Sequence, residues 1–196
     1  MESTKGIALH FYKYSESSVI AKIFTEKLGL QSYVLKGIRN KKSKNKLNLL
    51  QSLNLVNIEA SNISKRNIQY IKEIRSEIAL VELMGNMSKR FMSMFMSEVL
   101  LKVLIESEQE KNLFNYMENI ILSLNKKEDL NKNFSLIFLL KLSGYLGFSP
   151  STINSEKTTF DLENSCFTNQ STYYTISGEN KNYFVSLLKG EEVEIP

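Results

Sequence analysis

The chain has 196 residues and a formal net charge of +4, with 42% hydrophobic and 23% charged residues. These values are ordinary for a folded globular protein, and the length suffices for one large domain or two small ones. A single cysteine, Cys166, excludes an intrachain disulfide, a four-thiolate zinc site and a dithiol redox motif. The opening residues lack the apolar stretch of a secretory signal, and no run approaches the roughly eighteen apolar residues of a membrane span, so we expect a cytosolic protein without a membrane partner.

The charge is unevenly distributed along the chain. Residues 1–80 contain 14 Lys and Arg against 6 Asp and Glu, whereas residues 81–196 contain 11 against 15. The densest basic stretch is Lys36–Lys46, KGIRNKKSKNK, in which six of eleven residues are basic and none is acidic. Such a segment cannot bury its charges or fold alone, and its expected partner is a polyanion, most commonly nucleic acid. A solvated loop that only promotes solubility is the alternative.

Five short segments in the first part of the chain have the character of β-strands and are separated by turn signals. They cover residues 6–10, 19–25, 30–38, 49–59 and 68–74. Short strands at regular spacing predict a small β-barrel rather than a parallel sheet. The last segment is ambiguous, because residues 70–75 also fit the start of a helix.

The pattern then becomes helical. Residues 88–106 have apolar side chains on nearly every side of the helix, which is typical of a central, buried helix. The methionines of this helix are interpreted as core residues rather than as a soft-metal site. Two more helices are expected over residues 112–124 and 133–145.

Residues 149–182 are rich in Ser, Thr, Asn and Tyr and poor in helix formers, so we expect an irregular or β-containing lobe there. Phe160, Leu162 and Phe167 are the residues expected to anchor this lobe by burial. A short helix over residues 183–189 follows. Together these elements predict an α+β protein, in which a β-barrel is followed by helices and a small irregular lobe.

No pattern typical of an active site is present. Glycine-rich phosphate loops are absent, and His10, the single histidine, has no second histidine with which to bind a metal. Cys166 has no histidine near it in sequence to activate a thiolate. The carboxylates of Glu106, Glu108 and Glu110 fit a metal site, but a solvated helix end is the simpler interpretation. The chain is therefore predicted to be a binding protein without a cofactor, and not an enzyme.

A small barrel with a basic loop and exposed aromatic side chains is a common way to bind single-stranded nucleic acid. The expected phosphate contacts are Lys36, Arg39, Lys41, Lys42, Lys44 and Lys46. Tyr12, Tyr14 and Tyr33 are candidates for stacking on bases, and a core position fits Tyr33 equally well. Since nothing in the pattern reads base edges, we expect weak sequence preference and strong dependence on salt.

Six short motifs occur along the chain, and their order is more specific than any one of them. The first three are Tyr14-x-Glu16-x-Ser18, Thr25-x-x-x-Gly29 and Lys36-Gly37-x-Arg39. The later three are Leu50-Gln51-x-Leu53, Ile71-x-x-Ile74 and Leu142-x-x-Tyr145-x-Gly147-x-x-Pro150. In this order, over most of the chain, they resemble the RecO family of bacterial DNA repair proteins.

The resemblance implies an OB-fold barrel over residues 1–77 and a helical domain over residues 78–196, with the lobe at about 150–180. Proteins of that family mediate recombination without hydrolysing nucleotides. They bind single-stranded and duplex DNA, anneal complementary strands, work with RecR, and help the RecA recombinase to replace single-strand-binding protein on gapped DNA. By this resemblance Lys36, Arg39 and the basic loop would contact DNA at the bacterial nucleoid.

The resemblance also bears on partners and on zinc. In that family the acidic, apolar tail of single-strand-binding protein docks on the helical domain, and Arg90 is our candidate for meeting its carboxylate. Many members carry a four-cysteine zinc module after the position of Pro150, where this chain has only Cys166. We therefore expect no zinc, and we expect Phe and Tyr packing to hold the lobe. The family usually continues with further helices beyond the position of Pro196, which leaves the completeness of the helical domain open.

Two other classes of function remain open from the sequence. One is an RNA-binding OB module, because the pattern does not distinguish DNA from RNA. The other is a protein–protein adaptor whose basic loop binds acidic tails of its partners.

Overall fold

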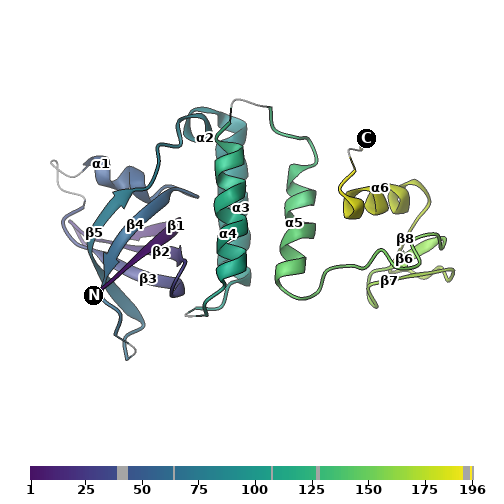
Figure 1. Cartoon of the computed structure of the whole chain (residues 1–196), viewed down its shortest axis with the longest axis horizontal. Coiled ribbons are helices and arrows are strands. Elements are labelled where there is room, and N and C mark those ends of the chain that lie inside the picture. The colour runs from purple at the N-terminus through teal and green to yellow at the C-terminus, as the bar shows by residue number, and fades with distance from the viewer. Residues whose placement is uncertain (39–43, 64, 107, 127–128, 192–194, 196) are drawn as a thin grey trace. The chain divides into compact units, whose positions relative to one another are not determined.

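The structure is a computed structural model of the chain. It describes residues 1–38, 44–63, 65–106, 108–126, 129–191 and 195, the side chains of residues 44 and 45 excepted. The chain forms two compact units, Met1–Asp129 and Leu130–Pro196 (Figure 1). The predicted boundary after residue 77 lies between the barrel strands and the first long helices, whereas the two units are divided later, because those helices belong to the unit of the barrel.

Five strands of the first unit form a closed barrel in the order β1-β2-β3-β5-β4 (Figure 1). They are β1 (Glu2–Lys13), β2 (Val19–Thr25), β3 (Gly29–Leu35), β4 (Leu55–Ala60) and β5 (Ile68–Ser76). All neighbouring pairs are antiparallel except β3 and β5, which are parallel. The predicted small barrel is confirmed and is OB-like, and the ambiguous segment at 68–74 is a strand.

The inside of the barrel is filled from alternating strand positions, as the pleat of a strand requires. The buried cluster contains Val19, Ala21, Ile23, Tyr33, Leu35, Ile38, Leu50, Val56, Ile58, Ala60 and Ile74. Most of these are β-branched or otherwise apolar, which suits a half-buried strand. The predicted strand at 49–59 begins only at Leu55, because a 3₁₀ turn over Asn48–Leu50 and a positive φ of 64° at Leu53 come first.

Helices follow the barrel within the same unit. They are α2 (Val81–Gly85), α3 (Met87–Val103) and α4 (Lys111–Leu124), and a short α1 (Lys44–Leu47) lies between β3 and β4. The buried stripe of α3 consists of Lys89, Ser93, Met96, Ser97 and Leu100, at helical spacing. Phe91 and Met94 of α3 are exposed, so the expectation of burial on nearly every side is wrong. Among the methionines of this helix, Met96 is fully buried.

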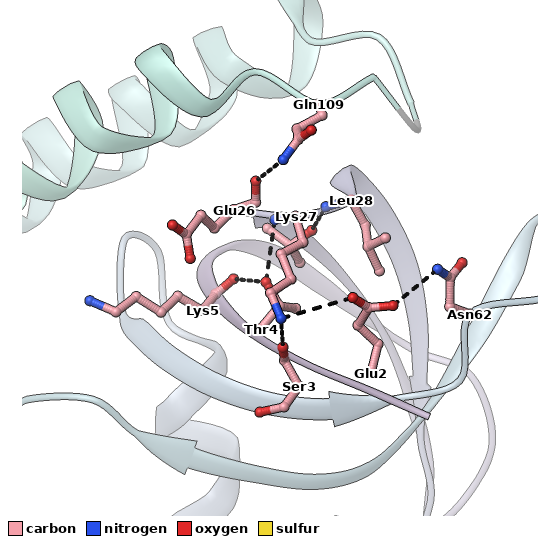
Figure 2. A network of polar contacts seen from close by, with 10 residues as sticks. Glu2, Ser3, Thr4, Lys5, Glu26, Lys27, Leu28, Asn62 and Gln109 are labelled. Atoms are coloured by element: carbon pink, nitrogen blue, oxygen red, sulfur yellow. Dashed lines mark hydrogen bonds and ion pairs between the residues drawn. The ribbon is translucent and has the colours of Figure 1, made fainter.

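The turn between β2 and β3 lies against the connection between α3 and α4. Gln109 of this connection donates from Nε2 to the carbonyl oxygen of Glu26 at 3.2 Å (Figure 2). The next residue, Lys27, donates from Nζ to the carbonyl oxygen of Ser3 at 2.8 Å, and its Nζ lies 3.9 Å from Oε1 of Glu2 (Figure 2). The turn is thus tied both to the helical connection and to the first strand.

Ion pairs join the barrel to the helical part of this unit. Lys5 Nζ donates to Oε1 of Glu118 in α4 at 2.9 Å and lies 3.3 Å from Oε1 of Glu77. The hydrogen bond with Glu118 raises the pKa of Lys5 above its usual value. Lys22 of β2 pairs with Glu106, so this carboxylate serves a structural contact. Within the described ranges, no group of three or more His, Cys, Asp or Glu is placed to hold a metal ion.

The second unit contains the small lobe that the sequence predicts. Helix α5 (Phe134–Tyr145) precedes a sheet of the order β7-β6-β8, and α6 (Gly178–Lys189) follows it. The strands are β6 (Thr159–Asp161), β7 (Cys166–Thr168) and β8 (Thr175–Ser177). The helix expected over 183–189 begins earlier, at Gly178. None of the helices that the structure describes is long and apolar enough to cross a membrane.

Aromatic side chains hold the lobe together. The ring of Phe160 lies 4.9 Å from that of Phe167 and 4.7 Å from that of Phe184, measured between centroids. Phe160 and Phe167 are buried, as predicted, whereas Leu162 is exposed and does not anchor the lobe. These pairs have the spacing at which aromatic rings attract one another beyond the burial of their area.

Candidate nucleic-acid interface

Three lysines from separate segments line one shallow hollow on the barrel. Lys36 directly follows β3, Lys46 lies in α1, and Lys72 lies on β5. All three side chains are exposed, the hollow measures about 70 Å³, and no acidic residue is among the described residues that line it. Lys36 and Lys46 are brought together as phosphate contacts require. Lys72 lies outside the basic run, and the sequence reasoning missed it.

An aromatic side chain lies beside Lys36. The ring centroid of Tyr70 is 5.1 Å from Lys36 Nζ and 5.9 Å from Cζ of Arg66, and 42% of Tyr70 is exposed. Tyr70 faces outward from β5 because its neighbour Gln69 points into the barrel wall and is buried. The pairing of β3 with β5 aligns Val34 with Tyr70, which explains why Lys36, two residues further along, reaches the ring.

The loop between β4 and β5 is organised by Gln69. Its Oε1 accepts hydrogen bonds from the backbone N–H of Ile63 and from Oγ of Ser61, both at 3.1 Å. Its Nε2 donates to the carbonyl oxygens of Ile63 at 2.9 Å and of Arg66 at 3.0 Å. A buried amide that makes four hydrogen bonds fixes the loop backbone at Ile63 and Arg66, and hence the point from which Arg66 extends toward Tyr70.

The structure does not test the other four predicted phosphate contacts. Arg39, Lys41 and Lys42 lie outside the described residues, and Lys44 lies in α1 with its side chain outside them. They therefore remain predictions. In sequence they lie between Lys36 and Lys46, and both of these lysines line the hollow.

The three predicted stacking tyrosines occupy different surroundings. Tyr33 has no exposed surface and lies in the barrel core, so it offers no ring face to a base and is not part of the interface. Burial raises the pKa of its hydroxyl to about 12. Tyr12 is exposed on β1, where its ring lies 4.9 Å from that of His10, and Tyr14 is exposed just after β1.

Arg90 lies at a separate pocket of the same unit. The pocket measures about 220 Å³ and lies where β1 and the segment before β4 meet α2 and α3. Its lining consists of His10, Phe11, Leu50, Gln51, Ser52, Met84, Arg90, Ser93 and Met94. Arg90 is exposed, and no acidic residue is among the described residues of the lining.

Comparison with known proteins identifies the family. Residues 1–77 match the family model described as "Recombination protein O N terminal", and residues 86–179 match "Recombination protein O C terminal". A protein named "DNA repair protein RecO" from Azobacteroides pseudotrichonymphae is 34% identical over 173 residues, which cover 88% of this chain and 72% of the relative. The chain belongs to the RecO family.

Two further RecO relatives cover still more of the chain. The protein from Flavobacterium johnsoniae is 31% identical over 186 residues, and that from Christiangramia forsetii is 33% identical over 187. Each alignment covers 94% of this chain and 78% of the relative. The RecO N-terminal match contains the whole barrel with its lysine-lined hollow and Tyr70, whereas Arg90 lies in the RecO C-terminal match.

Proposed function

We propose that this chain binds single-stranded DNA on the barrel face formed by Lys36, Lys46 and Lys72, and that it acts in DNA repair without catalysing a reaction. The observation that carries the proposal is the convergence of three exposed lysines in one hollow that no described acidic residue lines. Such a surface attracts a phosphate backbone and releases its counterions. Membership of a family whose members are named DNA repair protein RecO supports DNA as the polyanion.

The more detailed role that we propose is the one that the resemblance to the RecO family implies. We propose that the chain also binds duplex DNA, anneals complementary strands, works with RecR, and helps RecA to replace single-strand-binding protein on gapped DNA. Annealing has a direct physical basis here, because cations that neutralise phosphates on two strands reduce the repulsion between them.

The binding proposal is tested by fluorescence anisotropy of a labelled oligo-dT strand over a range of salt concentrations. Replacing Lys36, Lys46 and Lys72 together by Ala should weaken binding and lower the magnitude of the salt slope by about 2, at roughly 0.7 per lost phosphate contact. The matched control replaces Lys132, Lys141 and Lys189, which are exposed lysines of the second unit, and removes the same charge. Equal slopes in both variants would contradict the proposal.

The RNA-binding alternative is tested with the same protein and an RNA strand of matched length. DNA should bind at least as tightly as RNA under equal salt. Clearly tighter RNA binding, with the same dependence on the three lysines, would mean that the barrel face binds RNA and that the chain is an RNA-binding module.

We also propose that Arg90 receives the carboxylate of the acidic, apolar tail of single-strand-binding protein. The support is the pocket of about 220 Å³, in which an exposed Arg90 borders the apolar side chains of Phe11, Met84 and Met94. A labelled tail peptide should bind the protein and lose at least tenfold in affinity in Arg90→Glu, because the reversed charge repels its carboxylate. The control Lys102→Glu changes another exposed cation of α3. Peptide capture that depends on the basic segment instead would favour the adaptor function.

A further inference from the structure

The outer face of β5 presents an unusual succession of side chains. Ile68, Tyr70 and Lys72 alternate with inward-facing residues and are all exposed, Ile68 at 38% and Tyr70 at 42%. An apolar, an aromatic and a cationic side chain thus follow one another along a single strand. Lys72 continues into the lysine-lined hollow, so the ring of Tyr70 lies next to the proposed path of the phosphates.

Tyr70 is held in place by two hydrogen bonds between its backbone and Ser61. Its N–H donates to Oγ of Ser61 at 2.8 Å, and its carbonyl oxygen accepts from the N–H of Ser61 at 2.8 Å. The buried Gln69 beside it fixes the loop that carries Arg66. A ring mounted on a fixed strand loses little conformational freedom when a flat ligand lies on it, which favours binding.

Two cations lie near the ring of Tyr70. Lys36 Nζ and Arg66 Cζ are 5.1 Å and 5.9 Å from its centroid, and both side chains are exposed. A cation–π contact at an exposed site is worth about 0.5–1 kcal/mol, whereas a base stacked on an aromatic side chain is worth about 1–3 kcal/mol. A base therefore displaces a cation from the ring, and the displaced cation is already placed to pair with the adjoining phosphate.

We infer that Tyr70 is a base-stacking residue and that it makes this face prefer single-stranded over duplex DNA. The inference rests on the proposed function, since a base reaches Tyr70 only if DNA binds this face. In a duplex both faces of each base are covered by neighbouring base pairs, so duplex DNA uses the cations but not the ring. Every base has a π-face, so the stacking accepts any base.

The first test uses the absence of tryptophan from the sequence. Tyr70→Trp gives the protein a single tryptophan on the proposed stacking position. Its emission should be quenched by oligo-dT at the same concentrations at which the labelled strand binds, and an abasic strand of equal length should not quench it. The matched control is Tyr174→Trp, in the second unit, where the native tyrosine is 57% exposed; its emission should stay unchanged.

The second test measures affinity. Tyr70→Ala should lower the affinity for single-stranded DNA by about 5- to 150-fold and leave the affinity for duplex DNA unchanged. Tyr70→Phe should retain the wild-type affinity, because the stacking face is kept. Tyr174→Ala should behave as wild type toward both forms of DNA.

The outcomes separate the inference from the function on which it rests. Salt-dependent binding that leaves the Tyr70→Trp emission unchanged, or that Tyr70→Ala reduces equally for both forms of DNA, overturns the inference alone. Failure of the wild-type chain to bind either form at low salt overturns the proposed function and the inference with it. Quenching confined to Tyr70→Trp and to strands with bases supports both.

Discussion

Tyr33 and Tyr70 show how one barrel wall gives the same residue type opposite roles. Tyr33 on β3 is aligned with Gln69, and both are buried, whereas Tyr70, one residue further along β5, is exposed with two cations near its ring. Because a strand alternates its faces, a single uncertain position reverses the assignment of every side chain. The sequence left open whether residues 70–75 form a strand, and so it left out Tyr70 and Lys72 while naming Tyr33.

Replacing Tyr33 by Phe should remove part of the loss of stability at alkaline pH. Burial raises the pKa of Tyr33 to about 12 in the folded protein, against about 10 in an unfolded chain. The stability that its neutral form contributes is therefore complete below pH 10 and is lost as pH rises from 10 through 12. Between pH 8 and pH 11, urea unfolding should show that wild type loses about 1 kcal/mol more than Tyr33→Phe. Equal losses would mean that the Tyr33 hydroxyl reaches solvent in the folded state.

Among the elements, short strand-like segments at regular spacing were enough to predict the barrel. The polar composition of residues 149–182 was enough to predict the lobe, and two of its three expected anchors, Phe160 and Phe167, are buried. The turns were harder to predict from the sequence. Nothing in residues 49–59 indicates that Leu53 takes a positive φ and delays β4 to Leu55, because that conformation is set by packing rather than by local preference. The exposed ring of Phe91 on α3 was likewise unpredictable from helical periodicity alone.

The β2–β3 turn gives a prediction at this scale. Thr25 Oγ1 donates to the carbonyl oxygen of Gly29 at 2.9 Å and accepts from the N–H of Leu28 at 3.1 Å, which explains the Thr25-x-x-x-Gly29 motif. Gly29 has a φ of 66°, and a Cβ there would lie 1.9 Å from the carbonyl oxygen of Glu108. Gly29→Ala should therefore destabilise the fold by at least about 2 kcal/mol more than a change that adds only backbone strain.

The matched control for Gly29→Ala is Gly147→Ala. Gly147 has a φ of 84°, and an added Cβ would meet no atom within 4 Å, so it should cost only about 1–2 kcal/mol of strain. Thermal unfolding of both variants measures the difference. Similar midpoints for the two would show that the connection between α3 and α4 yields to the added methyl group.

The basic segment gives a second prediction at the scale of the element. Replacing Arg39, Lys41, Lys42 and Lys44 together by Ala should weaken binding of single-stranded DNA and flatten its salt dependence. The slope scales with the phosphates neutralised, at roughly 0.7 per contact, so a loss of up to about 3 is expected when all four make contacts. An unchanged slope in the salt titration would remove the segment from the interface and leave binding to the hollow alone.

At the scale of the whole molecule, the excess of basic residues lies in the part of the chain that contains the proposed DNA face. The basic residues 1–80 include the barrel and every residue of the proposed DNA face, whereas the acidic remainder carries the helices and the lobe. The two RecO matches, 1–77 and 86–179, follow this division, while the compact units assign α3 and α4 to the barrel. Ion pairs such as Lys5 with Glu118, distant in sequence, explain why composition alone did not place that boundary.

Because the lobe belongs to the second unit, a substitution that destabilises the lobe should leave DNA binding by the first unit unchanged. Phe160→Ala removes a buried ring that contacts Phe167 and Phe184, and it should destabilise the second unit by about 3–5 kcal/mol. Affinity for single-stranded DNA should stay within twofold of wild type at temperatures where the first unit is folded. Leu162→Ala, at an exposed position, serves as the control with little effect on unfolding. Loss of DNA binding in Phe160→Ala would assign the lobe a part in the interface.

The most direct measurement is a nuclear magnetic resonance titration of the isotope-labelled full chain with a short oligo-dT strand at low salt. Backbone amide signals should shift for the outer face of β5, for the loop between β4 and β5, and for the segments around Lys36 and Lys46. Signals of residues 130–196 should stay in place. Shifts confined to the second unit, or to the pocket at Arg90, with the β5 face unchanged, would contradict the claim that the barrel face binds DNA.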